Sequence, residues 1–172
     1  MPIYALGDLV PDIHPTAYVH PDAVLIGAVV LGEEASVWPG AVIRADDAPI
    51  YVGARTSIQD NSVLHTTFEH PTTVGADCVV GHMVHLEGCI IEDHCLIGSG
   101  SIVLHRVRVR TGAVVAANST LLNDLEVPSG AMAVGTPAVV KEGRARPDST
   151  VYGVLSYRDR AIRFRNDLRR LD

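Results

Sequence analysis

The sequence predicts an all-β solenoid, a parallel β-helix of six-residue repeats, followed by an α-helix at its C-terminal end. Aliphatic residues recur at every sixth position over about residues 11–140, and glycine often follows them. From about residue 148 the apolar spacing changes to three and four. Six-residue repeats are typical of β-helices, in which each short strand stacks on the next coil. A period of six does not match the 3.6-residue turn of an α-helix.

The composition fits one domain with a narrow core. The chain has 172 residues, of which 47% are hydrophobic but only 5% are aromatic. Valine, isoleucine, alanine and glycine must therefore fill the interior, which suits a narrow prism better than a helical bundle. Cys78, Cys89 and Cys95 are odd in number and lack CxxC spacing. We expect neither a disulfide framework nor a cysteine zinc site.

The net charge of −6 is unevenly distributed. Residues 1–140 hold 15 acidic and 5 basic residues, whereas residues 141–172 hold 5 acidic and 9 basic ones. The acidic body argues against nucleic acid as a partner, and the basic segment is expected to dock on that body. No apolar run reaches transmembrane length and no signal segment opens the chain, so we expect a soluble, cytoplasmic protein with no membrane partner.

The β-helix domain is predicted at residues 1–140. Its repeats form three blocks, separated by an insertion at 46–49 and another at 66–73. The repeated aliphatic residues are Ile13, Val19, Leu25, Leu31, Val37 and Ile43, then Val52, Ile58 and Leu64, then Val74, Val80, Leu86, Ile91, Ile97, Val103, Val109 and Val115. This periodicity resembles the hexapeptide-repeat family, which implies a left-handed β-helix with a triangular cross-section. In that fold three repeats make one coil, with the aliphatic residue inward and its neighbours outward.

Residues 141–172 are predicted to be a linker and a C-terminal α-helix packed along the prism. Pro147-Asp148-Ser149 is a helix start signal. Two stripes follow at helical spacing. The first consists of Val151, Val154, Leu155, Arg158, Ala161, Ile162, Arg165 and Leu168, and the adjacent one of Tyr157, Phe164 and Leu171. The arginines of the helix are interpreted as a solvated or salt-bridged face.

The repeat places the candidate functional residues in two ladders. In the first, His65 and Glu87 each follow an inward aliphatic residue of successive coils, so they should be neighbours about 4.8 Å apart, with Arg44 one coil further on. In the second, at a corner, Asp60 should adjoin His82. The two ladders lie a face apart within one chain, whereas a cyclic homotrimer would bring them together.

Such a trimer would share a divalent metal between His65 and Glu87 of one chain and His82 of its neighbour. Imidazole and carboxylate ligands suit zinc, and iron(II) and cobalt(II) are alternatives. His85 also points outward, about 6.5 Å along the strand from Glu87, and Val63 should lie beside it on the next coil. Glu87 is therefore the better-placed third ligand, and His85 is a supporting or substitute ligand.

Four motifs resemble the γ-class carbonic anhydrases and their homologues: Arg44-Ala45-Asp46, Gln59-Asp60-Asn61-Ser62-Val63-Leu64-His65, Gly81-His82 and Gly88-Cys89. In that family three histidines bind a divalent metal across a trimer interface. His65 and His82 match two of these ligands, and Glu87 stands where the family has the third histidine.

The resemblance also implies roles for other residues. Arg44 and Asp46 match the family's intersubunit pair, and Gln59 and Asp60 match its active-site pair. Tyr157 of the C-terminal helix could position substrate, or serve only in packing. The expected reaction is reversible hydration of CO2 to bicarbonate through a metal-bound hydroxide.

The substitution at Glu87 should weaken that reaction. A carboxylate ligand donates negative charge, so the metal would be a weaker Lewis acid and its bound water less acidic. Two alternatives remain open. One is an acyl-CoA-dependent transferase or thioesterase with His85 as base, and the other is a non-catalytic trimeric assembly module.

Overall fold

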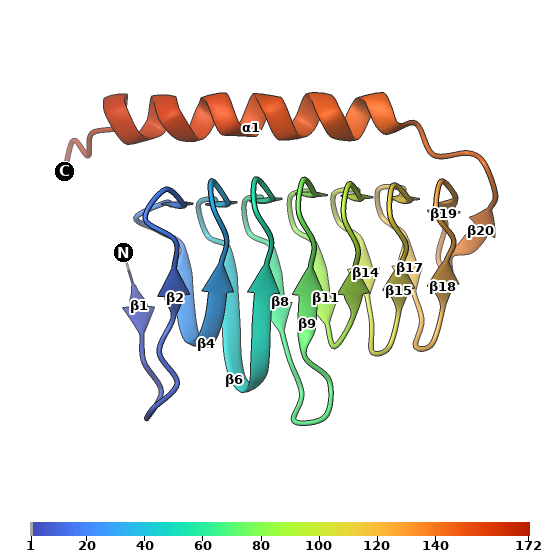
Figure 1. Ribbon diagram of the computed structural model, residues 1–172, viewed down its shortest axis with the longest axis horizontal. Helices are drawn as coiled ribbons and strands as arrows, with labels where there is room; N and C mark the ends of the chain where they lie inside the picture. The colour runs from blue at the N-terminus through green and yellow to red at the C-terminus, as the bar shows by residue number, and fades with distance from the viewer. Residues whose placement is uncertain (1) are drawn as a thin grey trace.

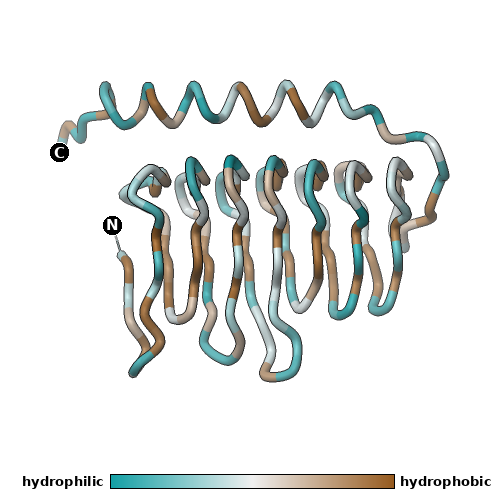
Figure 2. Tube along the Cα trace, viewed as in Figure 1, coloured by the Kyte–Doolittle hydropathy of each residue, from teal (hydrophilic) through white to brown (hydrophobic). Residues whose placement is uncertain are grey.

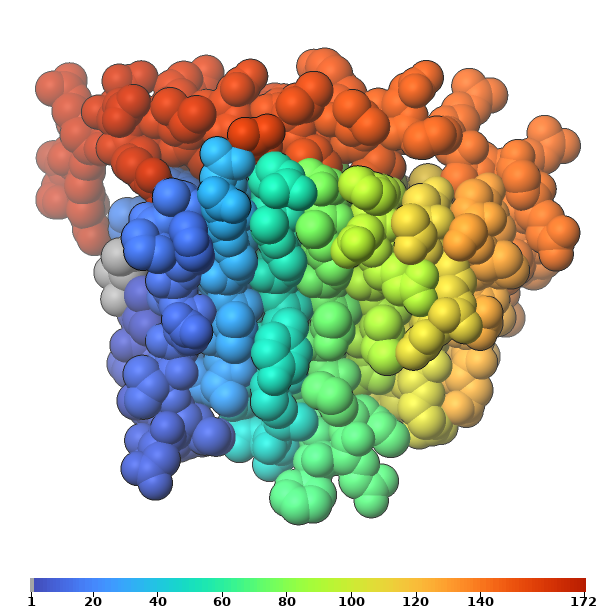
Figure 3. Space-filling model, in the orientation of Figure 1, coloured from blue at the N-terminus to red at the C-terminus, as the bar shows by residue number. Residues whose placement is uncertain are grey.

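The computed structural model describes residues 2–172, which form stacked β-coils with one helix, α1 (Pro147–Asp167), lying along them (Figure 1). The predicted fold, a left-handed parallel β-helix with a C-terminal helix, is confirmed. In the space-filling view the coils lie side by side as parallel bands and α1 runs across their edge (Figure 3).

The strands belong to two sheets. The larger has 12 strands: β1 (Ile3–Tyr4), β2 (Asp12–Ile13), β4 (Val24–Leu31), β6 (Val42–Val52), β8 (Val63–His65), β9 (Thr72–Val74), β11 (His85–Glu87), β12 (Ile90–Ile91), β14 (Ile102–Val103), β15 (Arg108–Val109), β17 (Thr120–Leu121) and β18 (Glu126–Val127). The smaller has 8: β3 (Tyr18–Val19), β5 (Ser36–Val37), β7 (Ser57–Ile58), β10 (Val79–Val80), β13 (Leu96–Ile97), β16 (Val114–Val115), β19 (Met132–Val134) and β20 (Val139–Lys141).

The larger sheet covers two faces of the prism because β6 turns a corner. The first residues of β6 pair with β8 and its last residues pair with β9. The paths β8–β11–β14–β17 and β9–β12–β15–β18 then run on separate faces, and the smaller sheet forms the third. All pairings between these strands are parallel except that of β20, which pairs antiparallel with β19.

The repeated aliphatic residues fill the interior, as predicted. Ile43 pairs with Leu64, Leu64 with Leu86 and Leu86 with Val103 in register, and each of the four is 0% exposed. Figure 2 shows apolar residues at matching positions of successive coils. The three cysteines are free and buried, in agreement with their interpretation as small apolar residues. A side chain placed by the repeat is therefore fixed relative to its neighbour one coil away.

The two insertions take different forms. Residues 46–49 stay within β6, and the register shift falls on its partner β4, between Gly27 and Val29. Gly27 permits this because its φ is +79° and a Cβ there would collide with the carbonyl oxygen of Ala45. Residues 66–71 instead leave the coil as a protruding loop between β8 and β9 (Figure 1), with Phe68 85% exposed.

Helix α1 begins at the predicted Pro147, and residues from both predicted stripes contact the prism. Val151, Leu155 and Ile162 are more than half exposed, whereas Val154 and Ala161 are buried. Gly153 sets this orientation, because a Cβ there would lie only 2.9 Å from Cγ2 of Val79 on the prism.

An aromatic cluster joins the helix to the first coils. Tyr18 and Trp38 are buried, and Tyr157 and Phe164 of α1 pack on them. The Trp38 ring meets the rings of Tyr157 and Phe164 edge-on, with centroids 5.1 Å apart in each case. Within residues 2–172, no helix has both the length and the apolar character needed to cross a membrane.

Candidate functional site

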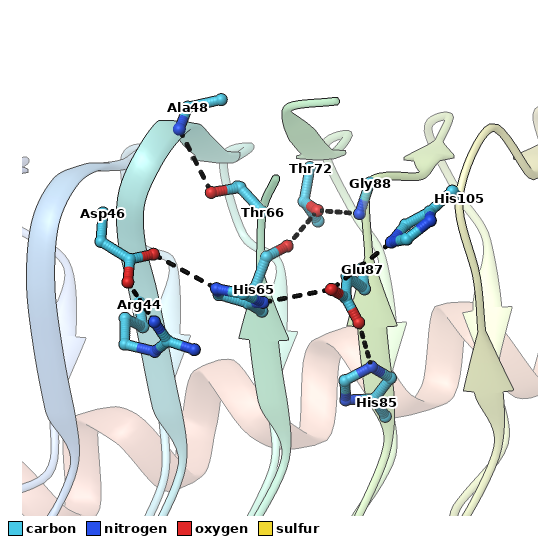
Figure 4. A network of polar contacts seen from close by, with 10 residues as sticks. All are labelled: Arg44, Asp46, Ala48, His65, Thr66, Thr72, His85, Glu87, Gly88 and His105. Atoms are coloured by element: carbon cyan, nitrogen blue, oxygen red, sulfur yellow. Dashed lines mark hydrogen bonds and ion pairs between the residues drawn. The ribbon is translucent and has the colours of Figure 1, made fainter. Parts of the chain in front are cut away.

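The first ladder converges on the carboxylate of Glu87, at the end of β11 (Figure 4). Glu87 pairs in register with His65 on β8, as predicted, and His65 pairs with Arg44 on β6. Oε1 of Glu87 lies 3.3 Å from Nδ1 of His65. Oε2 lies 3.0 Å from Nε2 of His85, whose strand neighbour is Val63, also as predicted. Glu87 therefore contacts both candidate histidines of the ladder.

The other ring nitrogen of His65 faces a second carboxylate. Nε2 of His65 lies 3.2 Å from Oδ1 of Asp46, and the other oxygen of Asp46 accepts a hydrogen bond from Arg44. Partial burial alone would raise the pKa of Asp46, but its backbone hydrogen bond and the charge of Arg44 lower it. Arg44, Asp46, His65 and Glu87 thus form one continuous polar row across three coils (Figure 4).

His105 also reaches this row, although no partner for it was predicted. Its Nε2 lies 3.4 Å from Oε1 of Glu87, at ion-pair distance but without hydrogen-bond geometry. Gly88 makes the approach possible, because its φ is +60° and a Cβ there would lie 2.9 Å from Cδ2 of His105. The sequence did contain one indication of this contact. His105 comes one residue after Leu104 of the first ladder, one coil beyond Gly88.

The environment keeps Glu87 ionised. Burial would raise its pKa, but hydrogen bonding from His85 and the contacts of His105 and His65 outweigh burial and lower the pKa. An ionised carboxylate is the form that can accept hydrogen bonds or ligate a metal.

The second ladder places Asp60 beside His82, as predicted. Oδ2 of Asp60 lies 2.8 Å from Nδ1 of His82. Nε2 of His82 lies 3.4 Å from the hydroxyl of Tyr157, which α1 delivers to this corner. Burial raises the pKa of Tyr157, so the phenol stays protonated at neutral pH. Gln59, next to Asp60, is 5% exposed.

The donor chemistry fits a borderline-soft divalent metal. His65 and Glu87 supply an imidazole nitrogen and a carboxylate oxygen from one face, and Asp60 on Nδ1 of His82 leaves Nε2 as the nitrogen for a ligand. Within residues 2–172 of a single chain, no three histidine, cysteine or acidic side chains are arranged to hold a metal ion.

Comparisons with known proteins give both family and fold. The family model "Bacterial transferase hexapeptide (six repeats)" matches residues 88–123. Gamma carbonic anhydrase 1 of Arabidopsis thaliana, a mitochondrial protein, is 37% identical over 137 residues. That match covers 76% of this chain but 50% of the relative, so the chain spans about half the length of that protein.

Two further relatives match over more of their own length. Carnitine operon protein CaiE of Escherichia coli O7:K1 (strain IAI39 / ExPEC) is 36% identical over 138 residues, covering 80% of this chain and 70% of CaiE. The crystal structure of a putative acetyltransferase from Bacillus cereus, the product of its BC4754 gene, superposes with a TM-score of 0.90 at 31% identity. That superposition covers 92% of this chain and 94% of the other.

Proposed function

Because this chain belongs to the γ-carbonic-anhydrase-like family of hexapeptide-repeat proteins, we propose that it is a metal-dependent lyase that hydrates CO2 reversibly at the interfaces of a homotrimer. The observation that carries the proposal is the pair of ladders. His65 and Glu87 adjoin on one face, and His82 is oriented by Asp60 at a corner. A cyclic trimer would place a face of each copy against a corner of the next, because head-to-tail contacts can close a ring.

His65 and Glu87 of one copy and His82 of the next would hold the metal, which is zinc, iron(II) or cobalt(II). When bound, such a metal acts as a Lewis acid and makes water ionise near neutral pH. Asp60 holds the imidazole of His82 in one tautomer. Arg44 and Asp46 hold His65 from the opposite side and stabilise the interface. Gln59 and Tyr157 orient substrate, one by its amide and the other by its hydroxyl.

The activity should be weak compared with a site of three histidines. Glu87 carries a negative charge, as its lowered pKa indicates. A charged ligand reduces the Lewis acidity of the metal, so less of the water would be ionised at neutral pH.

A second candidate function is acyl transfer from, or hydrolysis of, an acyl-CoA. Two observations favour it: the putative acetyltransferase from Bacillus cereus shares the fold, and His85 is paired with a carboxylate at 3.0 Å. A histidine oriented by a carboxylate is the usual arrangement of a general base.

Stopped-flow CO2 hydration by the zinc, iron(II) and cobalt(II) forms tests the proposal. We expect slow hydration that a chelator abolishes. If every metal form matches the metal-free background, the lyase proposal is wrong. Turnover of acyl-CoA under the same conditions would then support the second candidate, and the absence of both activities would indicate a non-catalytic trimeric assembly module.

A further inference from the structure

Both ring nitrogens of His82 are occupied within a single chain. Nδ1 lies 2.8 Å from a carboxylate oxygen of Asp60, and Nε2 lies 3.4 Å from the hydroxyl of Tyr157. An ionised carboxylate only accepts hydrogen bonds, so a neutral His82 donates its proton from Nδ1 and presents a lone pair on Nε2. The hydroxyl of Tyr157 can donate to this lone pair. It is the same lone pair that a metal ion would need.

Tyr157 is held at this position by Trp38. Trp38 is 3% exposed, and its indole N–H donates a hydrogen bond of 3.0 Å to Oγ of Ser36. Its ring meets the Tyr157 ring at an angle of 77°, and the guanidinium of Arg160 lies over that ring, 4.9 Å from its centroid. The phenol ring therefore contacts both a buried indole and a cation, with its hydroxyl toward His82.

We infer that Trp38 is a positioning residue that keeps the Tyr157 hydroxyl on Nε2 of His82, so that the hydroxyl competes with the metal for that nitrogen and is released when the metal binds. The inference rests on the proposed role of His82 as a ligand. It predicts that Tyr157 opposes metal loading, the reverse of what a residue needed only for folding would do. After loading, the released hydroxyl stays in the same corner, where it can donate to substrate.

Zinc affinity of the purified trimer, measured by competition with a chromophoric chelator, tests the inference without relying on activity. Tyr157→Phe should bind zinc about two- to tenfold more tightly than the wild type, because one weak hydrogen bond to Nε2 is removed. Trp38→Leu should also tighten binding, and Trp38→Phe, which keeps an aromatic edge, should restore wild-type affinity. Tyr152→Phe is the matched control, since Tyr152 lies on the same helix and is 74% exposed.

The double variant Trp38→Leu/Tyr157→Phe separates positioning from general packing. If Trp38 acts through Tyr157, the double variant binds zinc no more tightly than Tyr157→Phe alone. Additive effects would overturn the role of Trp38. Equal or weaker binding by Tyr157→Phe, with wild-type protein that does bind zinc, would overturn the competition while leaving the proposed function intact. A wild-type trimer that binds no metal would overturn both.

Discussion

At the residue scale, three imidazoles surround the carboxylate of Glu87, at 3.0 Å for His85, 3.3 Å for His65 and 3.4 Å for His105. Two of these histidines compete as partners for the same oxygen, so the position of Glu87 depends on all of its neighbours. The question for the metal site is whether Glu87 or His85 is the third ligand.

Alanine variants distinguish these two ligands. Glu87→Ala should sharply reduce metal occupancy, because it removes a ligand that adjoins His65 in register. His85→Ala should leave most of the metal bound, because Val63, not a ligand, lies beside His85. Elemental analysis of trimers purified without added metal measures the occupancy. If His85→Ala loses the metal and Glu87→Ala keeps it, we have assigned the wrong third ligand.

Glu87→His should raise CO2 hydration at neutral pH. The change restores three neutral ligands, so the bound water becomes more acidic and more of it is ionised. The pH dependence of hydration measures the effect, and the rising limb should move to lower pH. A variant that binds metal fully but is no faster than wild type would show that another part of the site limits the rate.

For these residues, the sequence predicted the contacts whose positions are set by the repeat. The pairing of His65 with Glu87 and the contact of Asp60 with His82 follow from the period of six together with the three repeats per coil that the hexapeptide resemblance implies, and both are confirmed. The contact of Asp46 with His65 was not predicted, because Asp46 lies in an insertion whose path the repeat does not set. His105 was missed because its approach depends on the left-handed backbone of Gly88.

At the element scale, the start of α1 and its two apolar stripes were predicted, but the line along which the helix contacts the prism was not. Proline at the first helical position fixes the start. The first predicted stripe is broad, however, and helical spacing does not say which of its members are buried, as Val154 and Ala161 are. The choice depends on Gly153, whose significance appears only beside Val79.

Gly153→Val should therefore destabilise the protein by about 1–3 kcal/mol through overpacking against Val79. Valine has the better helix propensity, so a loss of stability would report the clash and not the helix itself. Urea denaturation measures the change, with Tyr152→Val on the exposed side as the control. Equal stability of the two variants would contradict close packing of the helix against Val79 at Gly153.

A bidentate ion pair ties two successive coils together at another corner. Arg55 donates to both oxygens of Asp77, at 2.7 and 2.6 Å, and these hydrogen bonds lower the pKa of Asp77. A carboxyl with a lowered folded-state pKa stabilises the fold above its unfolded pKa of about 3.9, and this stabilisation is lost as the pH falls through the folded value.

Asp77→Asn should therefore cost about 1 kcal/mol at pH 7 and progressively less below about pH 4. Urea denaturation of wild type and variant between pH 7 and pH 3 measures the difference. A difference that stays constant down to pH 3 would mean that the ionised pair does not contribute.

At the scale of the whole molecule, the structure explains the uneven charge distribution through contacts between the C-terminal segment and the prism. Arg158 of the basic C-terminal segment pairs with Glu34 on the prism at 2.8 Å, and Arg165 donates to the carbonyl oxygens of Thr16 and Ala17. The basic segment thus docks on the acidic body, as predicted.

The assembly prediction belongs to this scale. We expect a homotrimer, and we expect Arg44→Ala to weaken it about tenfold or more, because the change leaves the Asp46 carboxylate without its arginine partner at the interface. Sedimentation equilibrium at micromolar concentration measures the dissociation. Arg108→Ala is the matched control, since Arg108 is also a partly exposed, paired arginine, but on the face of β15. A wild-type chain that sediments as a stable monomer would remove the only route by which His82 could join His65 and Glu87, and the proposed metal site would fail with it.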